Sequence, residues 1–248
     1  MTEIKRETYY SHFDAAGKMR RSAVIDFMQD CCTISRSSDK VIGELMRSGK
    51  ALLYVAYRQL DMISQPRYRE ALTIRTGLFE SRRVYGRRAT LMLGEDGRLI
   101  ARSYLVSTLV DAVTRRPLNL PKELSGALKL TPPPEMDFTP RKITLPENGG
   151  QDFPPFTALR CQADTNGHIN NARYADLCDE LIPADADISQ LRFEYKSSFM
   201  PGDRIFPTLY ALPDGSIITL SNEAGEVCAV SEYRERRSAG AKRIKNKE

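Results

Sequence analysis

The sequence contains one segment twice. Residues 14–31 and 164–181 align without gaps at an offset of 150 residues, and both open on an Asp-x-x-Gly sequence. An internal repeat of this kind indicates one architectural unit used twice along the chain. The copies differ in polar content, because the second has Asn166 and His168 where the first has alanine and lysine. Any fold for this chain must therefore hold two similar units, of which the second carries the reactive side chains.

Each copy has the same expected order of elements. A short strand, at about 4–13 and at 156–162, leads into a turn whose glycine, Gly17 or Gly167, adopts a backbone conformation that other residues resist. A helix follows, with apolar residues at helical spacing. In the first copy this stripe is Val24, Phe27, Met28, Cys31 and Ile34, and the helix is expected to run on through Met46.

Four β runs separated by hairpin signals follow each helix. The first copy is expected to form strands at Ala51–Ile63, Ala71–Val84, Arg87–Leu93 and Leu99–Val110, and the second at Ile188–Phe199, Arg204–Leu212, Ser216–Ser221 and Glu226–Arg236. A helix followed by an antiparallel meander, twice, predicts an α+β fold in which a sheet wraps a central helix.

Proline marks the boundary between the copies. Residues 126–155 hold seven of the fourteen prolines, and proline interrupts both helices and ladders, so this stretch is expected to be a linker. We therefore predict an N-terminal unit at 1–125, the linker at 126–155 and a C-terminal unit at 156–237. A basic tail at 238–248 is poor in apolar residues and is expected to be disordered.

Composition excludes several classes of protein. No apolar run approaches the roughly 18 residues that a membrane span needs, and the first residues show no signal peptide, so we expect a cytoplasmic protein without a membrane partner. The five cysteines and two histidines show no metal-ligand spacing. A net charge of +5 is too small to predict a nucleic-acid partner.

The segment at 164–171 carries the candidate chemistry. In an extended segment, Asp164, Asn166 and His168 would point to one side because they are spaced two residues apart. They precede a helix, whose free amides can stabilise a developing negative charge. An imidazole, a carboxylate and an amide at a helix start could hydrolyse an acyl bond. The alternative is a capped turn without catalytic function.

The sequence resembles the acyl-acyl carrier protein thioesterases. The resemblance is carried by Asp-x-Asn-x-His-x-Asn-Asn at 164–171, Arg-Gln-Leu-Asp at 58–61, Thr-Arg-Arg at 114–116 and Leu-Pro-Lys-Glu-Leu at 120–124. It implies a tandem (double) hotdog fold, with two antiparallel sheets that each wrap a helix. It also implies hydrolysis of fatty acyl-acyl carrier protein (acyl-ACP) thioesters to free fatty acid and carrier protein, which ends fatty acid synthesis. The implied partner is the acylated carrier protein, and no cofactor or metal is implied.

The same resemblance assigns Asp164, Asn166 and His168 as catalytic residues. His168 or Asp164 is the candidate base, Asn166 would position the water or the carbonyl, and amides near Gly167, Asn170 and Asn171 would bind the oxyanion. The family also has a later acidic residue on a strand, and here that position is Ser198. Ser198 could hold a water molecule but lacks a carboxylate to act as a base.

Two further sets of residues are weaker predictions. By resemblance the acyl chain runs into the first unit. The candidate lining residues there, although residues of this kind are more often ordinary core, are Met28, Met46, Leu53 and Met62. The candidate carrier-protein contacts are Arg82, Arg83, Arg87 and Arg88, since carrier proteins are acidic.

Two alternatives to this function remain open at this point. One is a thioesterase that acts on acyl-coenzyme A, because both substrates carry the same phosphopantetheine thioester. The other is a hotdog protein that binds acyl chains without turnover. The sequence also leaves open the chain length and branching of the substrate and the oligomeric state, a homodimer included.

Overall fold

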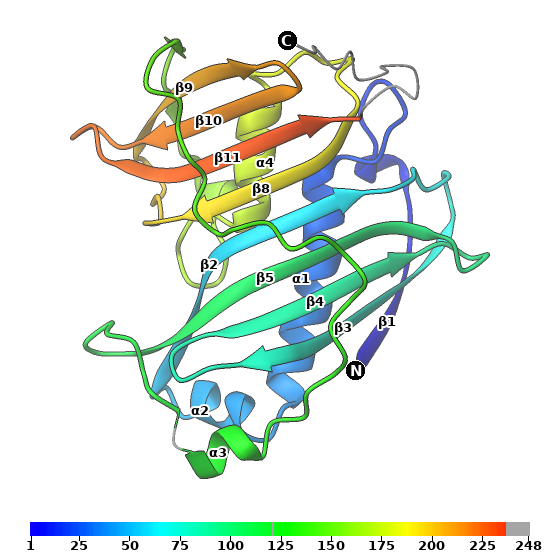
Figure 1. The fold of residues 1–248 in the computed structure, drawn as a ribbon, viewed down its shortest axis with the longest axis vertical. Coiled ribbons are helices and arrows are strands. Elements are labelled where there is room, and N and C mark those ends of the chain that lie inside the picture. Colours follow the sequence, from blue (N-terminus) through cyan, green and yellow to red (C-terminus); the bar gives the residue numbers. More distant parts are fainter. Residues whose placement is uncertain (121, 237–248) are drawn as a thin grey trace, which may run out of the picture.

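A computed structural model describes residues 1–120 and 122–236 of the chain (Figure 1). The first half contains β1 (Thr2–Glu7), a 3-10 turn (Tyr10–His12), α1 (Arg21–Ser38), α2 (Ile42–Arg47), β2 (Ala51–Met62), β3 (Ala71–Ser81), β4 (Gly86–Leu93), β5 (Leu99–Asp111) and α3 (Lys122–Gly126). The second half contains β6 (Gly150–Asp152), β7 (Phe156–Thr157), a 3-10 turn (Arg160–Gln162), α4 (Asn171–Asp179), β8 (Ile188–Tyr195), β9 (Arg204–Leu212), β10 (Gly215–Ser221) and β11 (Val227–Glu235).

The strands of both copies join into one antiparallel sheet. Its order is β1-β3-β4-β5-β2-β8-β11-β10-β9-β6. The short strand β7 pairs with the first residues of β9, Arg204 and Ile205. The joint between the copies is the pairing of β2 with β8, in which Tyr57 lies opposite Glu194 and Asp61 opposite Gln190. The predicted α+β double hotdog is confirmed, with the two sheets continuous through this joint.

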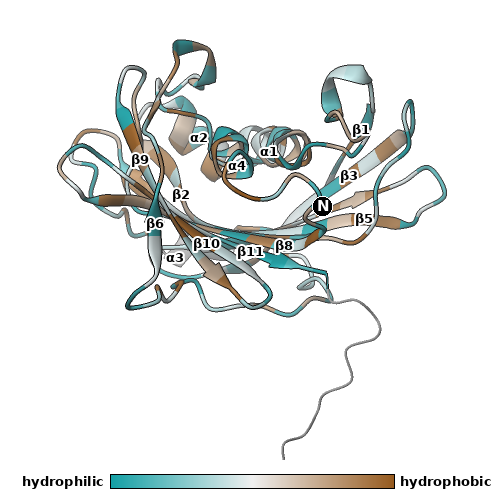
Figure 2. Ribbon diagram, turned by 90° about the horizontal axis from the view of Figure 1, so that it is seen from above, coloured by the Kyte–Doolittle hydropathy of each residue, from teal (hydrophilic) through white to brown (hydrophobic). Residues whose placement is uncertain are grey.

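Helices α1 and α4 lie side by side in the concave face of the sheet (Figure 2). They run antiparallel, because Arg21 at the start of α1 pairs with Asp179 at the end of α4 at 3.0 Å. Halfway along α1, Gln29 Nε2 donates to Asn170 Oδ1, just before α4, at 3.2 Å. The single large core cluster runs under both helices and is built from their apolar stripes and the inner face of the sheet.

The stripe predicted on α1 holds for four of its five members. Val24, Phe27, Met28 and Cys31 are buried, whereas Ile34 is 40% exposed. With 3.6 residues per turn, the inward face at the end of the helix has moved to Cys32 and Ser35.

Several predicted boundaries are wrong. The first helix ends at Ser38 and does not run on to Met46, because Asp39 takes an extended conformation. Its carboxylate accepts hydrogen bonds from the N–H groups of Val41 (2.9 Å) and Ile42 (2.8 Å), which starts α2 as a separate helix. The opening strands at 4–13 and 156–162 are shorter than predicted, since β1 ends at Glu7, β7 ends at Thr157, and each copy then forms a 3-10 turn. The strand predicted to reach Phe199 ends at Tyr195.

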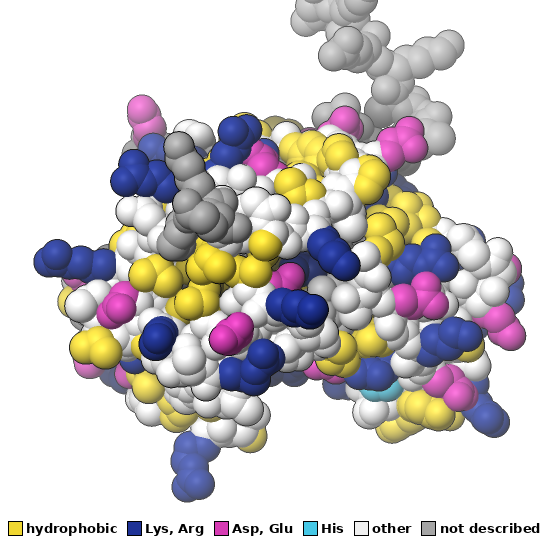
Figure 3. Space-filling view, turned by 90° about the horizontal axis from the view of Figure 1, so that it is seen from below, with side chains coloured by type: hydrophobic (Ala, Val, Ile, Leu, Met, Phe, Trp, Pro, Cys, Tyr) yellow, Lys and Arg dark blue, Asp and Glu magenta, His cyan; other side chains and the backbone are white. Residues whose placement is uncertain are grey.

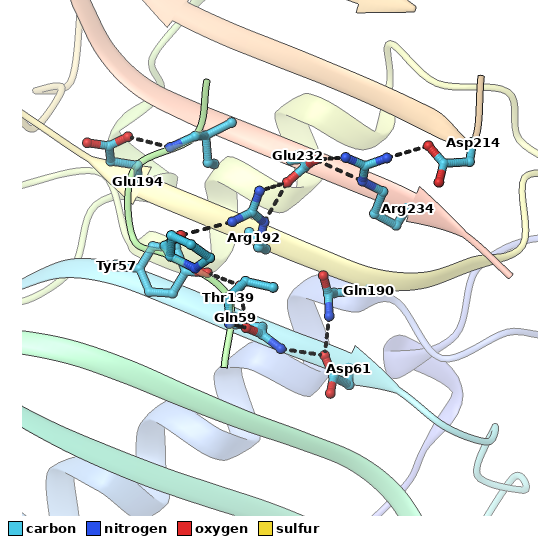
Figure 4. Close-up of polar contacts among 12 residues, drawn as sticks. Tyr57, Gln59, Asp61, Thr139, Gln190, Arg192, Glu194, Asp214, Glu232 and Arg234 are labelled. Atoms are coloured by element: carbon cyan, nitrogen blue, oxygen red, sulfur yellow. Dashed lines mark hydrogen bonds and ion pairs between the residues drawn. The ribbon is translucent and has the colours of Figure 1, made fainter. Parts of the chain in front are cut away.

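The proline-rich segment crosses the convex face of the sheet, opposite the helices (Figure 1). Gln59 holds it there: its Oε1 accepts hydrogen bonds from the N–H and hydroxyl of Thr139, and its Nε2 donates to the carbonyl of Asp137 at 2.9 Å. Glu194 accepts the Ile143 N–H at 3.2 Å, and Arg192 donates to the Pro140 carbonyl at 2.9 Å (Figure 4). The end of this segment forms β6, so it is tied to both copies.

Below the segment, charged side chains pair along the convex face. Arg192 pairs with Glu232, which also pairs with Arg234, and Arg234 pairs with Asp214 (Figure 4). Glu232 is nearly buried, so its two arginine partners supply the compensation that a buried carboxylate requires.

Some sequence predictions concern other parts of the chain. The basic tail predicted at 238–248 lies outside the described residues. None of the helices within 1–120 and 122–236 has the length and apolar character needed to cross a membrane.

We expect Gln59→Ala to lower the free energy of unfolding by about 1–3 kcal/mol, because it removes a buried amide whose hydrogen bonds hold Asp137 and Thr139 to the sheet. Urea denaturation measures this directly. Gln151→Ala is the matched control, since Gln151 is exposed on β6 and its removal should cost less than about 0.5 kcal/mol. Equal losses for the two variants would contradict the role assigned to Gln59.

Candidate active site

The repeated segment forms the same hydrogen-bonded turn in both copies. In the first, Asp14 N–H donates to the Lys18 carbonyl at 2.9 Å and Gly17 N–H to the Asp14 carbonyl at 3.0 Å. In the second, Asp164 N–H donates to the His168 carbonyl at 2.8 Å and Gly167 N–H to the Asp164 carbonyl at 3.0 Å. In each turn the aspartate carboxylate also accepts the N–H two residues later, at 2.9 and 2.8 Å. The duplication predicted from sequence is thus visible in these shared bonds. One bond differs, because the Lys18 N–H donates to the Asp14 carboxylate at 2.9 Å and the His168 N–H makes no such bond.

The glycine in each turn has the predicted left-handed conformation. Gly17 has φ of 73° and Gly167 has φ of 78°. A residue with a side chain would be strained at this φ, so the glycine lets the chain reverse before the helix.

The structure brings two of the three predicted catalytic residues into contact. Asp164 accepts hydrogen bonds from the Asn166 backbone N–H at 2.8 Å and from its side-chain amide at 3.3 Å. The prediction of an extended segment is wrong, because the residues form a tight turn in which Asp164 folds back over Asn166. His168 lies after the turn and is partly buried, and its imidazole forms no hydrogen bond with the residues that the structure describes.

Some backbone N–H groups near the turn donate hydrogen bonds within the protein, and others have no acceptor among the described residues. The Gly167 N–H is used within the turn, and the Asn170 N–H donates to the Gln162 carbonyl at 2.9 Å, so neither is available as predicted to an oxyanion. The N–H groups of His168 and Asn171 donate to no acceptor in the described part of the chain. These two, and not those of Gly167 and Asn170, are therefore the candidate oxyanion donors.

Asn170 instead caps the helix. Its side-chain oxygen accepts the Ala172 N–H at 2.9 Å, whereas Arg20, at the same position before α1, makes no side-chain cap. The Asn171 carbonyl accepts the Tyr195 hydroxyl at 3.4 Å. The start of α4 is thus held by groups from α1 and β8, which fixes the direction of its free amides.

Ser198 is exposed and lies just after β8. The Ile169 N–H donates to the Phe199 carbonyl at 2.9 Å, and the Phe199 N–H donates to the Tyr174 hydroxyl at 3.3 Å. These bonds hold the segment that carries Ser198 beside the segment that carries His168.

A cavity lies at the other end of α1, where α2 and the β3–β4 hairpin meet. It encloses about 570 Å³ of empty space, counting the solvent at its mouth. Leucines supply much of its wall: Leu53, Leu78, Leu109, Leu118, Leu120 and Leu128. Of the predicted acyl-lining residues only Leu53 is among them, because Met28 and Met62 are buried in the main core and Met46 is 36% exposed on α2.

The four predicted carrier-binding arginines do not form one surface. Arg82 and Arg87 both pair with Glu80, at 2.6 and 3.1 Å, and Arg83 lies at the cavity. Arg88 is only 9% exposed, because side chains alternate along a strand and its side chain faces α1, where it donates to Ser35 Oγ at 2.9 Å. Seen from this end of the molecule, basic side chains are spread among apolar and acidic ones (Figure 3).

One residue beside the site was not singled out for function from the sequence. Arg58 on β2 is 1% exposed, and its Nε atom has no partner among the described residues. A signal was present: Arg58 alternates with Tyr57 and Gln59 and shares the inward face of β2 with Leu60 and Met62, where an arginine is out of place. In the described ranges, no three His, Cys, Asp or Glu side chains lie close enough together to hold a metal ion.

Comparisons with known proteins agree with this architecture. An acyl-ACP thioesterase from Bacteroides thetaiotaomicron shares the fold with a TM-score of 0.84 at 18% identity, over 94% of this chain and 97% of that one. The 12:0-ACP thioesterase from Umbellularia californica shares it with a TM-score of 0.78 at 17% identity, over 95% and 98%. A search of curated protein sequences gives no match.

These matches show the double-hotdog fold. Residues 2–128 match the family profile of the acyl-ACP thioesterase N-terminal domain, and the chain belongs to that family. It is a thioester hydrolase that acts on fatty acyl-ACP.

We expect His168→Ala to lower kcat/KM by about 100-fold or more, the range for loss of a general base. Lys18→Ala is the matched control, since Lys18 occupies the same place in the first copy and should leave kcat/KM near the wild-type value. Steady-state kinetics on an acyl-ACP substrate measures both. Equal losses would overturn the assignment of the site to the second copy.

A second pair separates the turn from the chemistry. Asp14→Ala and Asp164→Ala should each lower the free energy of unfolding by about 1–2 kcal/mol, because both remove the carboxylate that closes the turn. Only Asp164→Ala should also lower kcat/KM, by about 100-fold, because it releases Asn166 beside His168. Denaturation and kinetics on the same preparations test this, and comparable loss of activity in Asp14→Ala would contradict it.

Proposed function

We propose that the turn at 164–171 performs the hydrolysis and that this reaction ends fatty acid synthesis by releasing the acyl chain from its carrier. The observation that carries the proposal is the contrast between two copies of one turn. The second copy adds an imidazole that has no hydrogen-bond partner among the described residues and an amide side chain held by Asp164. It also leaves the His168 N–H free within the described part of the chain, whereas the corresponding Lys18 N–H of the first copy donates to Asp14. The first copy has alanine and lysine at the corresponding positions.

In this mechanism His168 is the base. Its imidazole takes a proton from a water molecule, whose oxygen attacks the thioester carbonyl carbon. The carbonyl π electrons move to the oxygen, and the N–H groups of His168 and Asn171 stabilise the oxyanion, aided by the positive end of the α4 dipole. When the tetrahedral intermediate collapses, the C–S bond breaks, and the sulfur leaves with the electron pair and takes the proton from His168. The leaving group needs little further help, since a thiol has a pKa of about 8.5.

Asp164 and Asn166 are positioning residues in this scheme. The carboxylate of Asp164 is committed to Asn166, at 2.8 and 3.3 Å, and the same carboxylate closes the turn in the copy that lacks the chemistry. These bonds favour His168 over Asp164 as the base. The Asn166 amide, held in place by them, is suited to orient the water or the carbonyl.

Ser198 completes the site as a water-binding group. Its segment runs beside that of His168, and its exposed hydroxyl can both donate and accept a hydrogen bond. A hydroxyl orients water without removing its proton, which leaves the base role to His168.

The acyl chain would lie along α1. Gln29 contacts Asn170 at the site, and Arg36 lines the leucine-walled cavity seven residues further along the helix, a distance of about 10 Å at the rise of an α-helix. The cavity in the first unit is therefore the candidate acyl pocket, with Leu53 in its wall.

The carrier protein would approach the exposed arginines of the β3–β4 hairpin. Arg82 and Arg83 lie at the cavity mouth, and an acidic partner would be steered toward them even though each surface pair is weak. Arg88 is too deeply buried to contribute.

A second candidate substrate, acyl-coenzyme A, carries the same thioester and would meet the same turn. The distinction lies in the protein–protein contact, which only the carrier can make. A non-catalytic acyl-binding role is disfavoured by the free imidazole and free amides of the second turn.

We expect KM for acyl-ACP to rise with added salt, because charges at the surface are screened over about 8 Å at physiological ionic strength. KM for the same acyl group on coenzyme A should rise less. Arg82→Glu with Arg83→Glu should raise KM for acyl-ACP with little change in kcat. Arg69→Glu is the control, because Arg69 is exposed just before β3, at the end of that strand opposite the hairpin turn. Salt-independent acyl-ACP kinetics with efficient turnover of acyl-coenzyme A would favour the second substrate.

A further inference from the structure

Three arginines face the space between α1 and the sheet in the first unit. Arg88 on β4 lies opposite Leu105 on β5, and Leu105 lies opposite Arg58 on β2, so the three form one row across the sheet. With neighbouring strands about 4.8 Å apart, the two arginines of the row start about 10 Å from each other. Arg36 reaches toward the same region from α1.

These arginines lack carboxylate partners. None of the three forms an ion pair with a described acidic residue, and the Nε atoms of Arg36 and Arg58 are buried without a hydrogen-bond partner in the described ranges. Arg88 donates to Ser35 Oγ, a neutral acceptor. The single carboxylate of the described cavity lining, that of Asp39, is occupied by the N–H groups that start α2.

An arrangement of this kind is costly without a ligand. Removing a cation from water costs several kcal/mol unless an anion compensates it, and like charges add to that cost. Burial lowers the pKa of the Arg36 guanidinium from its usual value, and the positive charges of Arg88 and Arg58 lower it further. Arg36 and Arg88 line one cavity, and two guanidinium groups without carboxylate partners in one cavity are expected to meet an anion there.

The rest of the cavity defines the other half of that ligand. Its leucine-rich wall favours an aliphatic chain, and Arg36 and Arg88 lie within the same lining. The polar arm of a phosphopantetheine matches such a wall poorly.

Building on the proposed function, we propose that this cavity selects acyl chains whose far end carries an anionic oxygen group, a carboxylate, which Arg36 and Arg88 bind. The thioester of such a chain lies at the turn of the second copy, and its free end reaches the arginines along α1. Arg58, behind Leu105 in the same row, adds positive potential to the pocket. The preferred substrates are then thioesters of dicarboxylic acids, and the released product is a dicarboxylate.

The test compares two thioesters of equal chain length on the same carrier, one ending in a methyl group and one in a carboxylate, over a series of lengths. The wild-type enzyme should give a kcat/KM at least about tenfold higher for the carboxylate-ended chain at the best length. Arg88→Met should lower the ratio of kcat/KM for the carboxylate-ended chain to kcat/KM for the methyl-ended chain by about ten- to hundredfold. A methionine in place of a buried cation of similar volume should preserve folding. Arg36→Met, which should give the same fall in this ratio, is the second variant, and Arg75→Met, an exposed arginine on the outer side of β3, should not alter the ratio.

The outcomes separate this inference from the proposed function. If neither thioester is hydrolysed, or if His168→Ala hydrolyses them as fast as the wild type, the proposed function fails. If the methyl-ended chain is hydrolysed in a His168-dependent way and the carboxylate gives no advantage, this inference alone is overturned. Repeating the pair on N-acetylcysteamine, which has no phosphate, identifies the source of the anion. A loss in Arg88→Met that affects both chains on phosphopantetheine and neither on N-acetylcysteamine would assign the arginines to phosphate and overturn the proposal.

Discussion

The pairing of β2 with β8 is the contact on which the rest of the molecule depends. Five residue pairs, from Tyr57 opposite Glu194 to Asp61 opposite Gln190, convert two small sheets into one. Because successive side chains of a strand point to opposite faces of the sheet, this joint also determines which side chains the two faces present. On the convex face it presents Gln59 and Glu194 to the proline-rich segment, and on the concave face it presents Arg58 and Phe193 to the helices.

The joint explains why the proposed site draws on both copies. The turn belongs to the second copy, but the cap of its helix is contacted by Gln29 from the first. The cavity toward which α1 leads is lined by the first copy and, at Leu128, by the start of the linker. One copy alone would have a turn without a pocket, or a pocket without a turn. The shared sheet holds α1 and α4 side by side, and this places the two half-sites along one helix.

Sequence reasoning found the features that depend on short-range pattern. The Asp-x-x-Gly turn, its glycine conformation, the helical stripe and the antiparallel strands all follow from local spacing, and they agree with the structure. The sequence did not predict the features that depend on which hydrogen-bond partner a particular side chain takes. Asp39 turned to cap α2 and ended the first helix, and Asp164 folded over Asn166 where an extended segment was expected. The engagement of the Gly167 and Asn170 amides depends on carbonyls of the preceding turn, which spacing alone does not locate.

The methionines and arginines show that tertiary packing also decides roles that the sequence pattern leaves open. Methionine is a residue type that suits an acyl pocket, but Met28 and Met62 lie in the main core. Only the packing of the folded chain distinguishes a core position from a pocket position. Arg87 and Arg88 are neighbours in sequence, but the alternation of a strand sends the first to the surface beside Glu80 and the second under α1 beside Ser35. The exposed arginines of the β3–β4 hairpin are those proposed to attract the carrier, whereas the buried Arg88 is proposed to bind the acyl chain. In a duplicated fold whose two copies share a sheet, such alternation would let one hairpin present charge to a partner on its surface and to a substrate within.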